Sequence, residues 1–362
     1  MIRDLTLKSF RNYSEEKVSF QEGINVFLGK NGQGKTNLLE AVYFLGMLSS
    51  FRKADTNRMI KDGEEFFSIE GFFRDDHADS LIVEKGEKGW GKIGSDGRVY
   101  KKKTDYTGKI KMVVFSADDL ELIEGSPDVR RRYMDRAYFN IFRKHLKYLK
   151  SFKKILKQRN LLLKRSYCDR HELDVWSEKL AFFAGKVVEG RIDLLEILNG
   201  KLKINHPFTG TDKISLKYMG KGISTEGLNN IENEILDKLL SMRKEEVYRK
   251  TTLVGPHRDD VSIIINGVKA KSFSSRGEMR SILLAIKTAE VEAYRYLCDK
   301  EPIVLLDDVA SELDFDRRAH LFNYLRQRED QVLITTTEAE NLPLLQCEKK
   351  NIYKVEKGKI LH

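Results

Sequence analysis

A glycine-rich run near the N-terminus carries the clearest chemistry in the sequence. Its order matches the pattern G-x-x-x-x-G-K-[ST], in which backbone N–H groups wrap round the phosphates of a nucleotide. In this pattern the lysine reaches the β- and γ-phosphate oxygens, and the hydroxyl of the last residue ligates Mg²⁺. The run therefore predicts binding of ATP with Mg²⁺. Its members are Gly29, Lys30, Asn31, Gly32, Gln33, Gly34, Lys35 and Thr36.

Two adjacent aspartates, Asp307 and Asp308, follow an apolar run at residues 303–306. A carboxylate at the end of a buried strand beside a phosphate loop can hold the magnesium shell. We therefore expect Thr36 and Asp307 to be the metal ligands. Asp308 is expected to orient or deprotonate the water that attacks the γ-phosphate. The predicted catalytic residues are Asp308, Asp307 and Lys35.

The segments on either side of the loop suit this role. Residues 24–28 are a compact apolar run that predicts a buried strand, and residues 37–45 have helical spacing and good helix formers. A strand before the loop and a helix after it are the context that makes the pattern specific. The new helix also directs the positive end of its dipole at the phosphates. The apolar runs at residues 303–306 and 332–334 are typical of strands in parallel sheets.

A second, antiparallel sheet is expected beside this core. Residues 66–73 and 81–83 are predicted to be strands, and residues 95–97 supply an Asp-Gly turn of the hairpin type. A further hairpin is predicted where the strand-like run at 261–265 meets Asn266-Gly267.

The middle of the chain, from about residue 118 to residue 250, is predicted to be helical. Apolar pairs recur every seven residues from Ile141-Phe142 to Leu162-Leu163, which predicts an apolar stripe on one long helix. Residues 175–198 form a second helical run, which we expect to fold back on the first as an antiparallel hairpin. The stripe is best explained as core packing, so function is expected to lie in the charges around it.

Length and composition limit the class of protein. The chain has 362 residues, of which 33% are charged and 41% hydrophobic, enough for two or three structural units. No apolar run approaches the length of a membrane span, and the N-terminus has no secretion signal. Cys168, Cys298 and Cys347 lie far apart, which argues against a disulfide framework or a thiolate zinc site. We expect a cytoplasmic protein with no membrane partner.

Positive charge is concentrated in one segment. The formal net charge is +10, and residues 130–165 contain 14 Lys or Arg and one acidic residue, Asp135. This segment alone carries +13, so the remainder sums to −3. A basic excess confined to one region indicates a polyanionic partner, most commonly nucleic acid. Contacts to the phosphate backbone give a steep salt dependence and no base specificity. The lysines at 101–103 are candidates for the same surface.

Three short motifs surround the two aspartates. Residues 274–278 (Ser-Ser-Arg-Gly-Glu) precede a helix predicted at 281–297, residues 311–314 (Ser-Glu-Leu-Asp) follow the aspartates, and residues 335–337 (Thr-Thr-Thr) end a strand. Together with the phosphate loop, this order resembles that of the ABC-type ATPases. The resemblance implies an α/β ABC-type ATPase head, with a mixed sheet that carries the phosphate loop, an antiparallel β subdomain and an inserted helical arm domain. It also implies that Ser275 closes over the γ-phosphate of ATP bound by a second protomer.

Four longer blocks narrow the resemblance to the RecF family: residues 7–13, 114–120, 125–132 and 252–260. This resemblance implies a DNA-repair ATPase that forms an ATP-dependent homodimer on double-stranded or gapped DNA. With RecO and RecR it would help to place RecA on single-stranded DNA, and slow, DNA-stimulated hydrolysis would reset the dimer. We therefore assign residues 1–117 to the head with the phosphate loop, residues 118–250 to the basic helical arm, and residues 251–362 to the head with the signature motif and the aspartates.

Some residues differ from the family pattern or have an open role. Glu278 stands where the family usually has Gln, which adds negative charge near a phosphate site, and Ala117 replaces a common Pro. Asp308, where most ABC-type ATPases have Glu, agrees with the RecF family. We interpret His257 as a structural hydrogen-bonding residue. Arg258 and Arg11 are candidates for phosphate contacts.

Four alternatives remain at this level. A transporter's energy-coupling ATPase would bring a membrane partner and usually has a histidine at the switch position. A cohesin-like protein would need hundreds of coiled-coil residues. A small-molecule kinase with the same loop would have no use for the signature serine. An ATP-sensing scaffold would show negligible turnover.

Overall fold

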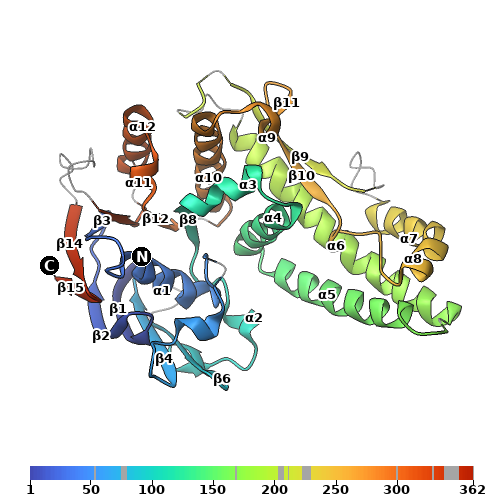
Figure 1. Cartoon of the computed structure of the whole chain (residues 1–362), viewed down its shortest axis with the longest axis horizontal. Coiled ribbons are helices and arrows are strands. Elements are labelled where there is room, and N and C mark those ends of the chain that lie inside the picture. Colours follow the sequence, from blue (N-terminus) through green and yellow to red (C-terminus); the bar gives the residue numbers. More distant parts are fainter. Residues whose placement is uncertain are drawn as a thin grey trace. The chain divides into compact units, whose positions relative to one another are not determined.

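The computed structural model describes residues 1–52, 54–74, 80–167, 169–202, 208–210, 212–221, 230–298, 301–327, 330–337 and 350–361. The chain divides into two compact units (Figure 1). Unit 1 comprises Met1–Asp119 and Glu290–His362, and unit 2 comprises Leu120–Ala289. Among the described residues, no helix combines the length and the apolar character that a membrane span needs.

Unit 1 contains the predicted antiparallel sheet, which has the strand order β2-β1-β4-β5-β6-β7. Alternate side chains are buried along β4 and β5, as at Leu81 and Val83, which are buried between partly exposed neighbours. This alternation leaves one face apolar and the other polar. Asp96 and Gly97 form the predicted turn, and both have positive φ. The strands are β1 (Ile2–Phe10), β2 (Tyr13–Ser19), β4 (Phe66–Phe73), β5 (Ser80–Gly86), β6 (Gly89–Ser95) and β7 (Arg98–Val99).

The second sheet of unit 1 is mixed, with the order β15-β14-β3-β13-β12-β8. β14, β3, β13, β12 and β8 run parallel, and β15 pairs antiparallel with β14. The central strands are buried almost throughout, as expected for parallel strands covered on both faces. The strands are β3 (Ile24–Leu28), β8 (Met112–Ser116), β12 (Ile303–Asp307), β13 (Val332–Thr336), β14 (Lys350–Glu356) and β15 (Lys359–Leu361).

Helix α1 (Lys35–Met47) packs against strands of both sheets, including β4 and β13 (Figure 1). Its residues from Leu38 to Met47 are all buried, and a helix that is apolar on every side must have protein around it. The remaining short elements of unit 1 complete the connections. They are η1 (Thr56–Met59), α2 (Lys103–Tyr106), η2 (Ala117–Leu120, which ends at the first residue of unit 2), α11 (Val309–Glu312) and α12 (Phe315–Arg326).

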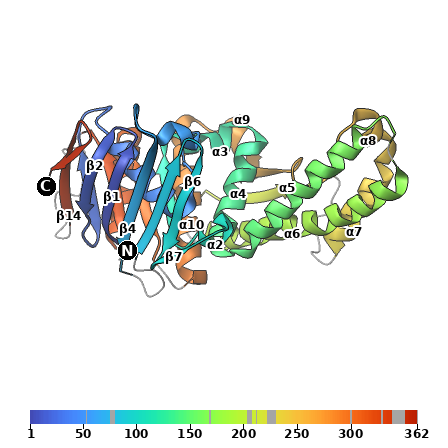
Figure 2. The same ribbon diagram turned by 90° about the horizontal axis from the view of Figure 1, so that it is seen from below.

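Unit 2 is mainly helical, as predicted, and α5 and α6 lie alongside each other as a hairpin (Figure 2). The apolar stripe belongs to two helices instead of one, because the extended backbone of Phe142 ends α4 before α5 begins. The helices are α3 (Glu121–Glu124), α4 (Pro127–Ile141), α5 (Lys144–Leu163), α6 (Arg170–Leu202), α7 (Ile231–Ser241), α8 (Arg243–Arg249), α9 (Ala270–Phe273) and the first part of α10 (Arg276–Cys298).

A three-stranded sheet in unit 2 has the order β11-β10-β9. β10 (Asp260–Ile265) pairs antiparallel with β9 (Ile214–Met219) along its whole length, and the predicted Asn266-Gly267 turn joins it to β11 (Val268–Lys269). This pairing attaches residues beyond 250 to unit 2. The division of the chain therefore falls within α10, after Ala289, and differs from the predicted boundary at residue 250.

Candidate nucleotide-binding site

The glycine-rich run forms the loop between β3 and α1, as the pattern requires. Gly32 and Gly34 have φ values of +80° and +118°, which residues with a side chain rarely adopt. A Cβ at Gly34 would lie 2.7 Å from Asn12 Nδ2, so this position also lacks the space for one. The loop conformation therefore depends on glycine at position 34 for two independent reasons.

Lys35 is 6% exposed, and its ammonium lies against the loop itself. Nζ donates to the carbonyl oxygens of Gly29 at 2.5 Å and of Lys30 at 2.9 Å. Burial lowers the pKa of Lys35, and the nearby carboxylates of Asp308 and Asp307 act in the opposite direction. The loop thus holds a cation at its centre, beside two acidic groups.

Asp307 lies at the end of β12, where it brings together two hydroxyl groups. Its Oδ1 accepts hydrogen bonds from Thr36 Oγ1 at 2.8 Å and from Thr335 Oγ1 at 2.9 Å. Burial raises the pKa of Asp307, and these two hydrogen bonds lower it in part. Carboxylate and hydroxyl oxygens at the mouth of a phosphate loop are the donor set that suits Mg²⁺. The residues present therefore fit this metal.

Asp308 has an unusual backbone and an unsatisfied side chain. Its φ is +53°, and its N–H donates to Thr335 Oγ1 at 2.9 Å, which fixes the residue at the start of α11. Its Oδ1 is buried and has no hydrogen-bond partner among the described residues. A buried carboxylate oxygen without a partner is costly, so it marks a position suited to a water or a cation.

Two residues where the β1–β2 turn meets β2 support the loop and were not predicted as site residues. Asn12 Nδ2 donates to Gln33 O at 2.9 Å, and Tyr13 OH donates to Gly34 O at 3.0 Å. Asn37 Nδ2 in turn donates to Asn12 Oδ1 at 2.8 Å. Asn12 and Tyr13 both lie in the block 7–13 that resembled the RecF family. That resemblance was the one signal in the sequence that pointed to them.

The hairpin β14–β15 forms another wall of the same loop. The backbone N–H of Gly358 donates to Gln33 O at 3.0 Å, and the N–H of Lys357 donates to Gln33 Oε1 at 2.7 Å. Val355 O lies so close to Gly29 that a Cβ there would approach it to 2.3 Å. Segments from both ends of the described chain therefore determine the shape of the loop.

Arg11, a candidate for a phosphate contact, is engaged elsewhere. Its guanidinium donates to both carboxylate oxygens of Glu40, at 2.9 and 3.0 Å, and to Arg58 O at 2.9 Å. Glu40 lies on α1 and is fully buried, so loss of Arg11 would leave an unpaired buried carboxylate. This geometry gives Arg11 a structural role in place of the predicted one.

Ser275 and Glu278 form a reciprocal pair at the start of α10. The backbone N–H of Ser275 donates to Glu278 Oε2 at 2.6 Å, and the N–H of Glu278 donates to Ser275 Oγ at 3.3 Å. This is the capping-box arrangement, which satisfies two donors at a helix N-terminus. Asp314 caps α12 in a similar way by accepting from Arg317 N. The Glu at position 278 therefore has a local role that a Gln would also fill.

His257 is partly buried in unit 2, where its Nε2 lies 3.2 Å from Thr252 O. Burial lowers the pKa of His257 to about 4, and neighbouring arginines act in the same direction. A neutral ring that donates to a backbone carbonyl agrees with the structural interpretation. Arg258 is exposed, with one hydrogen bond of 3.3 Å to the same carbonyl oxygen.

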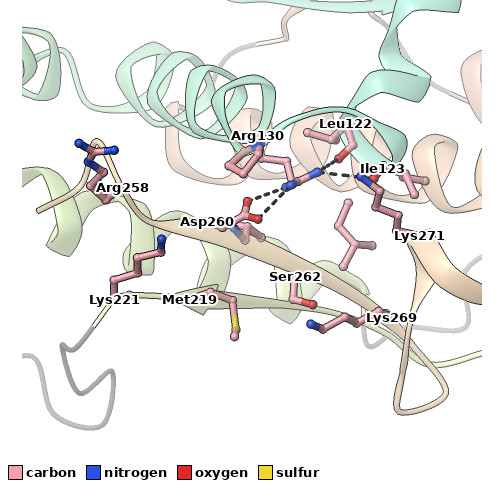
Figure 3. A pocket seen from close by; sticks show the side chains of 14 residues that line it. Leu122, Ile123, Arg130, Met219, Lys221, Arg258, Asp260, Ser262, Lys269 and Lys271 are labelled. Carbon is pink, nitrogen blue, oxygen red and sulfur yellow. Dashed lines mark hydrogen bonds and ion pairs between the residues drawn. The ribbon is translucent and has the colours of Figure 1, made fainter. Parts of the chain in front are cut away.

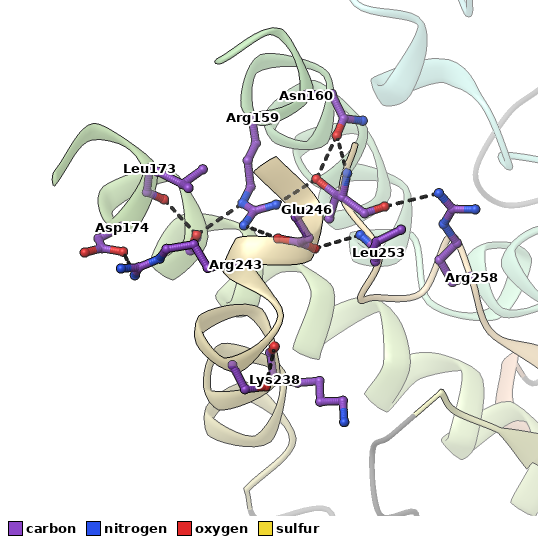
Figure 4. Close-up of polar contacts among 12 residues, drawn as sticks. Arg159, Asn160, Leu173, Asp174, Lys238, Arg243, Glu246, Leu253 and Arg258 are labelled. Atoms are coloured by element: carbon purple, nitrogen blue, oxygen red, sulfur yellow. Dashed lines mark hydrogen bonds and ion pairs between the residues drawn. The ribbon is translucent and has the colours of Figure 1, made fainter. Parts of the chain in front are cut away.

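Some arginines of the basic segment are buried and paired. Arg159 is fully buried and donates to Glu246 Oε2 at 2.6 Å, to Thr252 Oγ1 at 2.8 Å and to Ser177 Oγ at 3.1 Å (Figure 4). This network joins α5, α6, α8 and the segment that follows α8. Arg130 likewise makes a bidentate pair with Asp260. These arginines are unavailable to a polyanion.

The lysines of α5 behave differently, because they are exposed along the helix. None of them makes an ion pair or a side-chain hydrogen bond with the described residues. They recur at intervals of three or four, which places several on one side of the helix. They are Lys144, Lys147, Lys150, Lys153, Lys154 and Lys157.

These features, a phosphate loop between β3 and α1 and two aspartates at the end of β12, a parallel strand of the same sheet, define an ABC-type ATPase head. The family model described as RecF/RecN/SMC N terminal domain matches residues 1–360. A solved Smc head domain from Pyrococcus furiosus has the same fold, with a TM-score of 0.55 and 17% identity over 99% of this chain and 95% of that one. The predicted fold class is confirmed.

More similar proteins narrow the assignment. The protein named DNA replication and repair protein RecF in Geotalea uraniireducens is 37% identical over the full length of both chains, and that of Geobacillus thermodenitrificans is 35% identical over 99% of this chain and 98% of its own. The solved structure of the recombination mediator protein RecF with ATPrS is 29% identical, with a TM-score of 0.92 over 100% of this chain and 97% of that one. The chain belongs to the RecF family.

Proposed function

We propose that this chain is an ATP-dependent DNA-binding protein of recombinational repair, in which bound ATP joins two protomers. One observation carries the nucleotide part of the proposal: Asp307 gathers the hydroxyls of Thr36 and Thr335 beside a loop that already holds a buried lysine. Relatives described as RecF bound to ATP and to ATPrS support the same nucleotide.

In this proposal Lys35 turns from the loop carbonyls to the β- and γ-phosphate oxygens, and the loop N–H groups bind the rest. Thr36 and Asp307 would hold Mg²⁺, which neutralises charge that develops on the phosphate oxygens. Asp308 would accept a hydrogen bond from the attacking water through its unsatisfied oxygen. Its carboxylate is one methylene shorter than a Glu, so hydrolysis is expected to be slow and to act as a switch.

Substitution of the signature serine, Ser275, tests whether ATP joins two protomers. Ser275 of one protomer would close over the γ-phosphate held by the other. Lys35→Ala should abolish ATP binding, whereas Ser275→Ala should bind ATP normally and fail to dimerise, as measured by sedimentation velocity with and without ATP. Ser274→Ala is a matched control that removes a neighbouring hydroxyl. ATP-dependent dimers of Ser275→Ala at wild-type affinity would overturn the composite site.

The exposed lysines of α5 support DNA as the polyanion. Each phosphate that a lysine neutralises releases counterions, so the affinity should fall steeply with salt. Replacement of Lys147, Lys150 and Lys154 by Ala should lower the slope of log Kd against log salt by about 3. Binding to duplex, single-stranded and gapped DNA, each with and without ATP, identifies the preferred substrate. An affinity that does not change with salt would remove the case for this surface.

The partners are proposed from the relatives, one of which is described as a recombination mediator in the RecFOR pathway. In this chain the corresponding activity would be to recruit RecR with RecO and so help RecA onto single-stranded DNA in the cytoplasm. The test is the rate of RecA filament formation on gapped DNA that is coated with single-stranded DNA-binding protein. Lys35→Ala should lose the acceleration that the wild-type chain gives.

A further inference from the structure

A cleft of about 530 Å³ opens in unit 2, and none of its lining residues belongs to the nucleotide-binding loop. Its walls come from α3, α4, β9 and β10, with residues near β11 and α9 at one end (Figure 3). All of its lining residues belong to unit 2. Among these residues, only Arg258 and Arg130, the first residue of the basic segment, were given a candidate role from the sequence.

The floor of the cleft is apolar. Leu122 and Ile123 contribute from α3, and Val261 and Ile263 from β10, all of them largely buried. Met219 at the end of β9 also lines the cleft, and 42% of its surface is exposed. A flexible, exposed thioether beside aliphatic side chains can adapt to an apolar group of another molecule. The floor therefore suits one aliphatic or aromatic side chain.

The rim of the cleft is cationic. Lys221 and Arg258 lie toward one end in Figure 3, and Lys269 and Lys271 toward the other. All four are exposed. Between the two ends, Arg130 and Asp260 cancel each other in a bidentate ion pair at 2.7 and 2.9 Å.

That pair also fixes the charge of the cleft. Burial alone would raise the pKa of Asp260, but the hydrogen bonds and the charge of Arg130 lower it, so this carboxylate stays ionised and paired. The lining thus has five cationic side chains and one anionic one, a balance of +4.

We propose that this cleft binds an extended acidic segment of a partner protein, with one apolar side chain on the floor and carboxylates at both ends. The spacing supports a peptide of modest length. Lys269 pairs in register with Ile264 of β10, and Arg258 lies in the turn that ends two residues before β10 begins at Asp260. The extended backbone from Asp260 to Ile264 spans about 13 Å, so a segment of about six residues can run along it and reach past both of its ends to the cations.

The apolar floor favours a peptide over nucleic acid. A phosphate backbone would use the cations equally well, but it has no group that gains from contact with Leu122, Ile263 or Met219. Phosphate contacts alone are also insensitive to the neighbouring apolar surface. A peptide in which acidic residues flank an apolar one would contact both the cationic rim and the apolar floor.

Fluorescence anisotropy with three labelled hexapeptides tests the proposal on the full chain. The first probe has the order Glu-Asp-Leu-Phe-Glu-Asp, the second has Ser in place of Leu and Phe, and the third has Lys in place of every acidic residue. We expect saturable binding of the first probe, several-fold weaker binding of the second, and none of the third. Equal binding of the first two, or competition by a 12-nucleotide DNA strand against the second, would reassign the cleft to phosphates.

Matched variants test whether the first probe binds in the cleft. Lys269→Ala with Lys271→Ala should weaken the first probe about fivefold, the range expected for two exposed charge pairs. Lys238→Ala with Lys244→Ala removes the same charge from α7 and α8 of the same unit and should have no effect. Met219→Ser should weaken the first probe and leave the second unchanged. Equal losses in both lysine double variants would show attraction to net charge and overturn the proposal.

A measurement on the wild-type chain guards against misfolded variants. The first probe can carry a benzophenone at its Phe position, and mass spectrometry then identifies the residues to which it cross-links. We expect cross-links to Met219 and to its neighbours on β10. Cross-links confined to other parts of the chain would overturn the assignment whatever the variants show.

Discussion

Thr36 and Asp307 lie 271 residues apart in the chain and share a hydrogen bond of 2.8 Å. The sheet order explains their meeting, because β13 lies between β3 and β12 and all three strands are parallel. Their carboxyl ends share one edge of the sheet, where the loop after β3 and the aspartates after β12 converge. In open α/β sheets this edge is where ligands bind.

The hydroxyl of Thr36 provides the first prediction. Thr36→Val keeps the shape of the side chain but removes the oxygen, so the affinity for ATP with Mg²⁺ should fall by at least about tenfold. Binding of ATP in EDTA should change little. Thr36→Ser retains the oxygen and should resemble the wild type. Calorimetric titration with and without Mg²⁺ makes the measurement, and an equal loss under both conditions would contradict the metal role.

Gly34 and Gly97 form a matched pair for the loop geometry. Both have positive φ, but a Cβ at Gly34 would collide with Asn12, whereas a Cβ at Gly97 would have nothing within 4 Å. Each change to Ala should cost about 1–2 kcal/mol of backbone strain. Gly34→Ala alone should lose ATP binding. Unimpaired ATP binding by Gly34→Ala would show that the loop tolerates displacement of Asn12.

Glu278→Gln should strengthen the ATP-dependent dimer. The amide oxygen of Gln can still accept from the N–H of Ser275, so the capping box remains while a negative charge is removed. A charge near a helix N-terminus that binds a phosphate is worth about 0.5–1 kcal/mol, or roughly a twofold to fivefold change in dimer affinity. Glu87→Gln, on the β5–β6 turn, is the control for net charge. An unchanged dimer constant would show that Glu278 does not face the nucleotide.

The partial burial of His257 predicts a pH dependence of stability. Its pKa is about 4 in the folded chain and about 6.5 when unfolded, so between these values the unfolded chain binds a proton that the folded chain does not. Stability should therefore fall as the pH decreases from 6.5 to 4. His257→Gln keeps a donor for Thr252 O but does not titrate. The drop in Tm between pH 7 and pH 5 should be smaller for this variant than for the wild type.

Arg159 and Lys157 lie on the same helix, α5, and mutating each one distinguishes a charge that stabilises the fold from a charge that is proposed to bind DNA. Arg159→Met leaves Glu246 buried without its partner and should destabilise the fold by about 3–5 kcal/mol. Lys157→Met should change stability by less than about 0.5 kcal/mol. Only Lys157→Met should act on DNA binding with the fold intact, lowering the salt slope by about 1. Urea unfolding and DNA titration measure the two effects, and similar stabilities of both variants would contradict the burial argument.

Local patterns in the sequence predicted the parts of the site that depend on neighbouring residues. The loop at residues 29–36, the strand and helix that flank it, and the Asn266-Gly267 hairpin all follow from short-range chemistry. The fold class followed from the order of motifs along the chain. These predictions succeeded because turn residues and apolar runs act within a few positions of themselves.

The contacts between distant segments could not be predicted in the same way. Nothing within residues 29–36 indicates that Asn12 and Tyr13 support the loop, since they lie at the junction of β1 and β2 in the other sheet. A count of positive residues also cannot distinguish Arg159, which is buried against Glu246, from the exposed Lys157. The break at Phe142 escaped detection because the apolar period of seven continues across it. The pairing of β10 with β9 places the division of the chain at residue 289. This pairing also joins segments that are distant in the sequence, so no local pattern predicts it.

The hairpin β14–β15 has a consequence for how the protein is made. Gly358 and Lys357 bind Gln33, and Val355 closes against Gly29, so the nucleotide loop is supported by residues that the ribosome adds more than 300 positions later. A nascent chain that lacks this hairpin has the complete glycine-rich sequence but an unsupported loop. The loop therefore reaches its supported conformation only after residues 355–358 have been synthesised.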